Sequence, residues 1–255
     1  MRENKIYSVV KASQYKNGSF SIIDEKLVDD IYLEIFINDE IVDKILTIRV
    51  DSHYLGIGIF FCLFDFSPSY ILSNGEFDEN RIRIKTGLDI PPSGYKSKKN
   101  SGISKKEYDF NNLSDKEIKI SPEVLFKARE DFENSSQIFR ETAGVHGAGL
   151  YDKNGDNIVF TYDISRFNSL LKLIGFMIKN QTKFSGIEES FIVTSSRLNS
   201  EMIKVVKKSG IKIIASRGAP SKTAFVEAEK EKLTLISFLK AERFTVFSHD
   251  FRIKT

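Results

Sequence analysis

The clearest hydrophobic pattern lies in the second half of the chain, from residue 142 onward. Short apolar runs alternate there with polar loops and with segments whose apolar residues recur every three or four positions, the spacing of an amphipathic helix. A small-residue loop around His146 and a turn at Asn154-Gly155 open this region. The pattern predicts strands over 158–162, 191–194, 211–215, 233–237 and 244–247, and helices over 167–180, 201–208 and 222–231. Such alternation predicts a largely parallel sheet with helices on its faces.

The first half is dominated by strand patterns. Residues 31–37 and 41–50 are strand-length apolar runs on either side of a turn, and residues 81–84 alternate strictly. The run 54–66 is so apolar that it suits a buried helix as well as a buried strand. A helix start at Ser121-Pro122-Glu123 then predicts a helix over about 122–134, with Ser121 as its N-cap.

A change in composition separates the two halves. Residues 91–119 are rich in Ser, Lys, Asn and Gly, which is typical of a linker. The sequence therefore predicts an α/β protein, α+β overall. It consists of a β-rich domain over 1–95, a basic linker loop over 96–120 and an α/β domain over 121–255.

The net charge, the cysteine count and the lengths of the apolar runs exclude several classes of protein. A net charge of +3, from 38 basic and 35 acidic residues, does not indicate nucleic-acid binding. The single cysteine, Cys62, excludes a disulfide framework and a Cys-rich metal site. The start has no apolar core of signal-peptide length, and the most apolar run is too short to span a bilayer. We therefore expect a cytoplasmic protein that does not contact membranes.

The loops that follow the predicted strands of the second half carry the candidate chemistry. In a parallel sheet these loops converge on one edge, where helix N-termini add free backbone N–H groups that favour anions. They contain the cations Arg166, Arg197, Arg217, Lys222, Lys240 and Arg243, and the polar residues Ser165, Ser195, Ser196, Asn199, Ser216 and Ser221. Together they favour a phosphate-bearing ligand. The alternative is that the polar residues are helix caps and the cations are surface charges.

Single residues and known motifs add less. His146 suits an acid, base or ligand contact as well as a structural hydrogen bond. Cys62, within an apolar run, is most simply a small buried hydrophobe. The chain contains no phosphate-binding loop, no nucleophile elbow, no dinucleotide fingerprint and no zinc-deaminase motif. A metal site, zinc included, is therefore not expected.

Five blocks of the sequence resemble the FdhD family, the accessory sulfurtransferases of formate dehydrogenase. The family patterns are T-G-G-x-H-x-A, E-D-V-G-R-H-N-A-x-D-K, S-G-R-x-S-x-E-M, S-x-x-A-P-T and G-F-x-R. They correspond here to Thr142–Ala148, Tyr162–Asn168 with Lys172 following, Ser195–Met202, Ser216–Ser221 and Ser237–Lys240. With the opening β region, the resemblance covers most of the chain.

The resemblance implies a cytidine-deaminase-like, three-layer α/β domain without zinc, and a homodimer. It also implies binding of the guanylylated molybdopterin cofactor (the molybdenum bis-guanine-dinucleotide cofactor, of which GDP is an analogue) and sulfur transfer to it from a cysteine desulfurase. The family's closing cofactor segment falls on Phe238, Leu239, Lys240, Ala241, Glu242 and Arg243. With the residues of the other loops, the candidate cofactor-binding positions also include His146, Asp163, Arg166, Asn168, Ser195, Arg197, Ser216 and Lys222.

This chain departs from the family where the sulfur is carried. Family members have a C-G-x-C loop between the two halves, and Ser101 and Ser104 occupy the cysteine positions here. A serine hydroxyl stays protonated at neutral pH and cannot form a persulfide, which needs a cysteine thiolate. The family's Glu, Gly and second His in the second block are replaced by Tyr162, Ser165 and Phe167.

Three hypotheses follow. The chain is a cofactor-binding accessory protein for formate dehydrogenase that holds phosphates with the loop cations, contacts the ligand with His146 and orders one loop with Asp163 and Asn168. Alternatively, it remains a sulfurtransferase through Cys62. In the third hypothesis it is a non-catalytic paralogue that pairs with a cysteine-bearing partner as a heterodimer.

Overall fold

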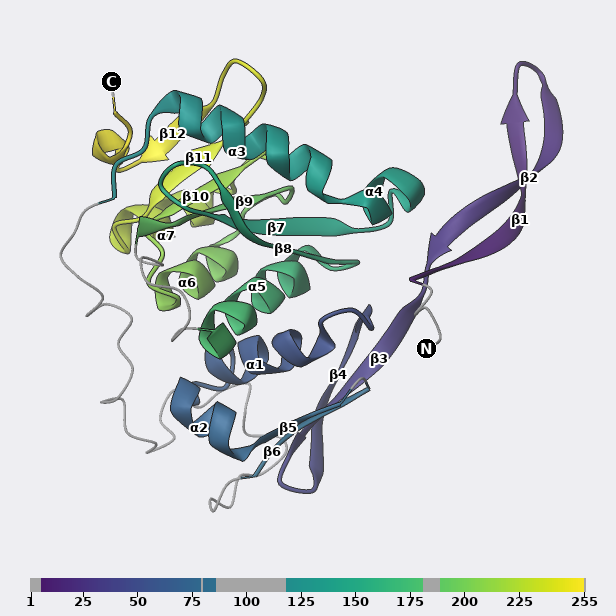
Figure 1. The fold of residues 1–255 in the computed structure, drawn as a ribbon, viewed down its shortest axis with the longest axis horizontal. Coiled ribbons are helices and arrows are strands. Elements are labelled where there is room, and N and C mark those ends of the chain that lie inside the picture. Colours follow the sequence, from purple (N-terminus) through teal and green to yellow (C-terminus); the bar gives the residue numbers. More distant parts are fainter. Residues whose placement is uncertain (1–5, 79, 86–117, 181–188, 255) are drawn as a thin grey trace.

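The computed structural model describes residues 6–78, 80–85, 118–180 and 189–254. The described chain forms a six-stranded sheet, a four-stranded sheet, the helices that separate and cover them, and a two-stranded hairpin that projects from the body (Figure 1). The predicted α+β class is confirmed. Most of the predicted linker lies outside the described residues, but Ile118 and Ile120 are buried, and Ile120 pairs with Ile253.

The six-stranded sheet forms the second half, with strand order β12-β11-β10-β9-β7-β8. Its strands are β7 (His146–Tyr151), β8 (Asn157–Asp163), β9 (Phe191–Thr194), β10 (Ile213–Ser216), β11 (Thr234–Ser237) and β12 (Thr245–Ser248). Only the pairs β9–β10 and β10–β11 are parallel, so the prediction of a largely parallel sheet is wrong. The β7–β8 hairpin and the short loop from β11 to β12 are too brief for parallel crossovers and impose antiparallel pairing.

The small-residue loop expected around His146 is also wrong, because strand β7 begins there. Packing requires a glycine at position 147, because a Cβ there would lie 2.6 Å from the ring of Phe160 on β8. The predicted turn at Asn154-Gly155 is confirmed between β7 and β8, with Gly155 at φ 79°.

Helices cover both faces of this sheet. One face carries α3 (Pro122–Ser135), which is followed by the short α4 (Gln137–Thr142) that the sequence analysis did not predict. The other face carries α5 (Arg166–Asn180), α6 (Ser200–Lys208) and α7 (Lys222–Lys230). Ser121 occupies the N-cap position of α3, but its side chain bonds Glu123 and lowers the pKa of that carboxyl instead of capping a backbone N–H.

The first half packs against α5 from the side opposite the sheet (Figure 1). It contains α1 (Ser52–Cys62), α2 (Pro68–Asn74) and a sheet of β3 (Asp30–Ile37), β4 (Glu40–Ile48), β5 (Gly75–Phe77) and β6 (Arg81–Ile84). The ambiguous apolar run forms α1, which is apolar all round because it lies between this sheet and α5. The α1 and α5 backbones touch: a Cβ on Gly175 would lie 1.9 Å from the Tyr54 carbonyl oxygen.

The hairpin of β1 (Tyr7–Lys16) and β2 (Ser19–Val28) is called the arm below. It turns at Asn17 and Gly18, which both have positive φ, as a two-residue hairpin of matching twist requires. The strands predicted from the sequence did not include β1. At the opposite end of the chain, a 3-10 turn over Asp250–Arg252 follows β12.

Candidate functional site

The structure brings the predicted loops together in one row. Strands β8, β9, β10 and β11 all end at the same edge of the sheet, where the antiparallel β7 begins with His146. We call this row the loop edge; it comprises His146 and residues 164–166, 195–199, 216–222 and 238–244.

Backbone hydrogen bonds lock three of these loops together. The Leu198 N–H donates to the Ala219 carbonyl oxygen (3.2 Å), and the Leu239 N–H donates to the Ser216 carbonyl oxygen (3.0 Å). Gly218 fits between the loops because it has no side chain: a Cβ there would lie 2.8 Å from the Arg197 nitrogen. The loop edge is therefore a preorganised surface.

Several polar residues of the loop edge serve the backbone, as the alternative interpretation expects. Asn199 and Ser221 cap α6 and α7 by accepting from the N–H groups of Met202 (3.0 Å) and Ala224 (3.1 Å). Ser216 is buried, donates to the Ser196 carbonyl oxygen and accepts from the Gly218 N–H. Its hydroxyl is thus engaged within the protein.

The cations behave differently from the polar residues. Arg217 forms an ion pair with Glu133 (3.4 Å). The other five side chains are exposed and form no ion pair with any residue that the structure describes: Arg166, Arg197, Lys222, Lys240 and Arg243. Most of the cations at the loop edge therefore have no ion-pair partner within the described part of the chain.

His146 connects two of the loops. Its Nδ1 lies 3.4 Å from the Ser195 hydroxyl, which also accepts from the Gly147 N–H (3.1 Å). Partial desolvation, and secondarily the nearby charge of Arg166, lower the pKa of His146 below its ordinary value of 6.5. The imidazole is therefore neutral at pH 7, and can donate or accept a hydrogen bond at the loop edge.

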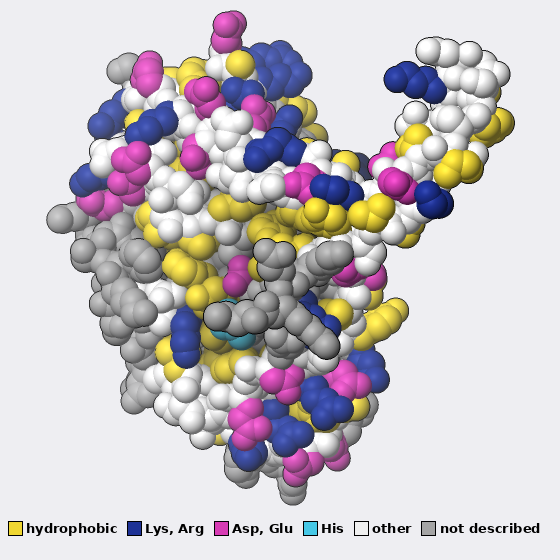
Figure 2. Space-filling view, turned by 45° about the vertical axis from the view of Figure 1, so that its right-hand side comes forward, with side chains coloured by type: hydrophobic (Ala, Val, Ile, Leu, Met, Phe, Trp, Pro, Cys, Tyr) yellow, Lys and Arg dark blue, Asp and Glu magenta, His cyan; other side chains and the backbone are white. Residues whose placement is uncertain are grey.

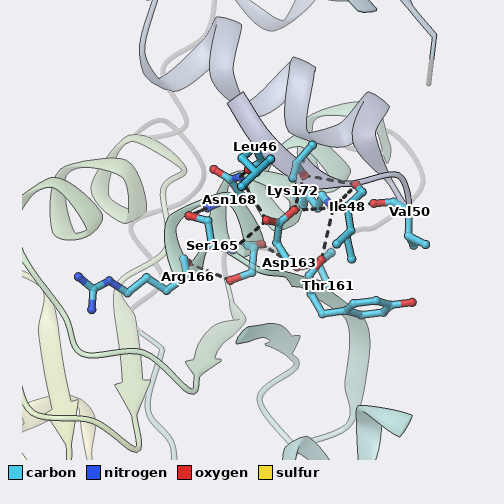
Figure 3. A network of polar contacts seen from close by, with 12 residues as sticks. Leu46, Ile48, Val50, Thr161, Asp163, Ser165, Arg166, Asn168 and Lys172 are labelled. Carbon is cyan, nitrogen blue, oxygen red and sulfur yellow. Dashed lines mark hydrogen bonds and ion pairs between the residues drawn. The ribbon is translucent and has the colours of Figure 1, made fainter. Parts of the chain in front are cut away.

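Asp163 and Asn168 lie beneath the loop edge rather than on it (Figure 3). The fully buried Asp163 carboxylate pairs with the Lys172 ammonium (2.8 Å), accepts from Asn168 Nδ2 (3.2 Å) and is bonded by the Thr47 hydroxyl. It also accepts from the Ser165 N–H (2.9 Å). These two side chains therefore order the 163–166 loop from below and do not face a ligand directly.

Lys172 ties this network to the first half of the chain. Its ammonium donates to the carbonyl oxygens of Val50 (2.6 Å) and Ile48 (3.3 Å) at the end of β4, and to that of Tyr162 (3.4 Å). Burial lowers the pKa of Lys172, while Asp163 opposes this shift. We call Thr47, Asp163, Asn168 and Lys172 the buried polar network.

The segment assigned to the cofactor by resemblance, 238–243, contains one exposed ring. Phe238 has a left-handed backbone (φ 54°), and its side chain is 38% exposed. Leu239 is buried, whereas Lys240, Ala241, Glu242 and Arg243 are exposed in a turn closed by a bond from the Lys240 N–H to the Arg243 carbonyl oxygen (2.8 Å). A non-glycine residue in this conformation is strained, and such strain is common at functional sites.

Two serines at the strand ends add to the site. The hydroxyls of Ser196 and Ser237 are buried and have no hydrogen-bond partner among the described residues. Such a group costs about 1–3 kcal/mol if it stays unsatisfied, so both are candidates for bonding a polar ligand. Ser237 was not among the predicted site residues, although a polar residue that ends an apolar strand is a usable signal.

The sequence and its fold were compared with known proteins. The model of the FdhD/NarQ family matches residues 76–254, which is most of the chain. The chain belongs to the FdhD/NarQ family. A Listeria innocua protein named sulfur carrier protein FdhD is 27% identical over 262 residues, covering 95% of this chain and 97% of that protein. A Bacillus subtilis protein of the same name is 36% identical over 138 residues, covering 54% of this chain and 51% of that protein.

A crystal structure from Desulfotalea psychrophila shares the fold. It belongs to a protein named as a candidate formate dehydrogenase accessory protein, with a TM-score of 0.79 and 23% sequence identity. The match covers 98% of this chain and 100% of that one. This FdhD/NarQ chain thus shares the fold of that structure.

Ser101 and Ser104, which the resemblance aligns with the family cysteines, lie outside the described residues of this FdhD/NarQ chain. Cys62 is partly buried in the apolar core, and burial raises the pKa of its thiol to about 12, as its apolar neighbours predict. Lys208, which acts electrostatically on this thiol, lies in the last turn of α6, whereas α6 begins at the loop edge. The raised pKa therefore disfavours the Cys62 thiolate, and Cys62 lies away from the loop edge.

Two further properties constrain this family member. Within the described ranges, no group of three or more His, Cys, Asp or Glu residues could hold a metal ion. None of the helices described here combines the length and the apolar character that a membrane crossing needs.

Proposed function

We propose that this protein is a formate dehydrogenase accessory protein that binds the guanylylated molybdenum cofactor at the loop edge. The observation that carries the proposal is the set of five exposed cations that form no ion pair with any described residue, on loops at one sheet edge, three of which are locked together. The names of its relatives, sulfur carrier protein FdhD and formate dehydrogenase accessory protein, supply the biological setting. Formate dehydrogenase is the proposed client.

The residues present suit this ligand. Its phosphates would be held by Arg166, Arg197 and Lys222, with Lys240 and Arg243 beside them, and by the free N–H groups at the start of α6 and α7. The guanine base would stack on the exposed ring of Phe238. The buried hydroxyls of Ser196 and Ser237, which have no hydrogen-bond partner within the described ranges, are candidate donors for polar ligand atoms.

We further propose that the protein holds the cofactor without carrying sulfur. Its serines at 101 and 104 cannot form a persulfide, and the high pKa of Cys62 disfavours that thiol as a substitute. A cysteine desulfurase would then act on a cysteine-bearing member of the family and not on this chain.

Calorimetric titration with GDP tests the cofactor site, at low and at moderate salt. Because a hydrogen bond to a charged group contributes about 1.5–3 kcal/mol, Arg197→Ala should weaken GDP binding roughly tenfold to a hundredfold. The matched control is Lys232→Ala, which removes one exposed positive charge just after α7, the end of that helix away from the loop edge. Added salt should weaken wild-type binding, since phosphate contacts at the surface are screened.

Absence of binding at millimolar GDP would contradict the proposal, and so would equal losses in Arg197→Ala and Lys232→Ala. If GDP did not bind, this chain would share the fold of the family but not the proposed cofactor site. The second would assign the affinity to net charge rather than to the loop edge.

Alkylation of the full-length protein tests the second part. Because the pKa of Cys62 is raised from 9.0 to about 12, its thiolate fraction near neutral pH is about a thousandfold lower than for a free thiol. Iodoacetamide should therefore label the native protein about a thousandfold more slowly than the urea-unfolded protein. Fast native labelling, or a persulfide formed on incubation with a cysteine desulfurase and cysteine, would contradict a carrier that holds no sulfur.

A further inference from the structure

The loop edge is rich in cations, and one acid reaches it from another element. Six of its seven charged residues are Lys or Arg, and Glu242 is the exception. On the face that Figure 2 shows, by contrast, acidic and basic side chains are interspersed. Glu133, in the last turn of α3, pairs with Arg217 of the loop edge (3.4 Å). An element outside the loop edge thus neutralises one of its cations.

Glu133 occupies an unfavourable position on its own helix. The carboxyl end of a helix carries a partial negative charge, so cations stabilise the last turn and acids destabilise it. The last turn of α3 contains no basic residue. Arg129 pairs with Glu133 from one turn earlier, but base before acid is the weaker order for such a pair. Helix stability alone therefore does not favour an acid at this position.

The two oxygens of the Glu133 carboxylate have different partners. Oε2 pairs with Arg129, whose side chain is 20% exposed, and Oε1 pairs with Arg217, whose side chain is 47% exposed. An exposed ion pair is weak and is screened by salt, so the contact with Arg217 is the one that opens readily. When it opens, Glu133 keeps Arg129 as its counter-charge.

Only the side chain of Arg217 has to move for this exchange. Its backbone N–H donates to the Thr194 carbonyl oxygen (3.2 Å), which fixes the start of the loop. The guanidinium group binds carboxylates and phosphates with the same planar set of donors. A terminal phosphate carries roughly two negative charges near neutral pH, against one on a carboxylate. A phosphate at the loop edge can therefore take Arg217 from Glu133.

We propose that Glu133 competes with the phosphates of the ligand for Arg217 and thereby lowers the affinity of the loop edge. In the free protein Arg217 pairs with Glu133, and in the complex it turns to a phosphate. Glu133 is thus a positioning residue that acts through Arg217. This inference rests on the proposed function, because it takes the ligand of the loop edge to carry phosphates. A lowered affinity suits a protein that has to release its ligand to a client.

Calorimetric titration with GDP tests the proposal through a gain of affinity. Glu133→Gln keeps the size of the side chain and removes its charge, so GDP should bind roughly two- to fivefold more tightly. The matched control is Glu130→Gln, which removes the same charge from an exposed position on the same helix and should leave the affinity almost unchanged. Damage to the fold would weaken binding, so it cannot produce the expected gain.

A double-mutant cycle determines whether Glu133 acts through Arg217. Arg217→Ala alone should weaken GDP binding, and adding Glu133→Gln to it should give no gain. In the Arg197→Ala background the gain should persist, because Arg197 forms no ion pair with any residue that the structure describes. Glu133→Met, an uncharged side chain of similar length, should reproduce the gain of Glu133→Gln. Urea unfolding of each variant reports on its fold separately.

Equal or weaker GDP binding by both Glu133 variants would overturn the proposal. A gain of the same size in Glu130→Gln, or in the Arg217→Ala background, would overturn it as well, because the effect would then come from net charge. In all these cases GDP still binds to the wild type, and the proposed function stands. A wild type that does not bind millimolar GDP would contradict the proposed function itself, and this inference with it.

Discussion

The buried polar network and the loop edge lie in adjoining stretches of the chain and treat charge in opposite ways. Lys172 has no exposed surface, and it satisfies its charge with the Asp163 carboxylate and three backbone carbonyl oxygens. Arg166, six residues earlier, is exposed and has no ion-pair partner among the described residues. The Lys172 charge links the end of β4 to α5, whereas the Arg166 charge stays available at the surface.

The difference shows which charges can contribute to function. A buried charge must be paired, because an unpaired one would cost several kcal/mol of desolvation. An exposed charge costs little when it is unpaired, so a protein can keep several of them together for a ligand. The buried network therefore holds the 163–166 loop in place, while the loop edge keeps its cations free.

The largest expected effect is a loss of stability when the buried polar network is disrupted. Lys172→Met leaves the Asp163 carboxylate buried without its counter-charge, which should lower the free energy of unfolding by about 3–5 kcal/mol. Urea unfolding followed by circular dichroism measures this change. The control on the same helix is Lys179→Met, whose exposed ammonium should matter little.

Equal losses of unfolding free energy in Lys172→Met and Lys179→Met would show that the buried and the exposed charge contribute alike to stability. A stable Lys172→Met protein with weakened GDP binding would show that Lys172 acts on the ligand, which its burial argues against.

A smaller effect is expected at the loop edge. Phe238→Ala removes the exposed ring proposed to stack on guanine, which should weaken GDP binding about tenfold. The free energy of unfolding should change little by comparison with Lys172→Met. Phe251→Ala, at an exposed ring in the 3-10 turn after β12, is the control and should bind GDP normally. Unchanged affinity in Phe238→Ala, measured by calorimetry, would remove the ring from the site.

Much of the fold could be predicted from hydrophobic spacing. Helix α5 begins within one residue of its predicted start, since its apolar stripe and the polar loop before it are local signals. The direction of β7 and the existence of the arm could not be predicted in this way. Glycines in β7 mimic a loop, and an arm with apolar residues on both faces lacks the one-sided alternation that marks a strand on a core.

The site could be predicted only in part. The convergence of strand-end loops follows from topology, and the sequence therefore placed Arg197 and Lys222 on one edge correctly. It could not distinguish the exposed cations from the buried Lys172, or exposed polar residues from the buried Asp163, because burial depends on contacts with β4 more than one hundred residues away. It also could not show that Arg217 is paired with Glu133 on α3.

The smallest expected effect concerns the proton on His146. Its pKa in the folded protein lies below the ordinary 6.5 because of desolvation and Arg166, so the unfolded chain binds this proton more readily. The contribution of His146 to stability is therefore present at neutral pH and is lost as the pH falls below about 6.5. A bound anion has the opposite effect and raises the pKa of His146, since the negative charge favours the protonated ring.

GDP affinity should thus rise as the pH falls from 7.5 to 5.5, while the unliganded protein becomes less stable. The gain should be roughly two- to fivefold, as for an exposed charge pair. His146→Asn should bind GDP almost as well as the wild type at pH 7.5 and lose most of this gain at pH 5.5. Taking the ratio of the two proteins at each pH cancels the titration of the phosphates. Parallel affinity curves for both proteins would place His146 outside the ligand's reach, and the loop edge would then bind its ligand through permanently charged side chains alone.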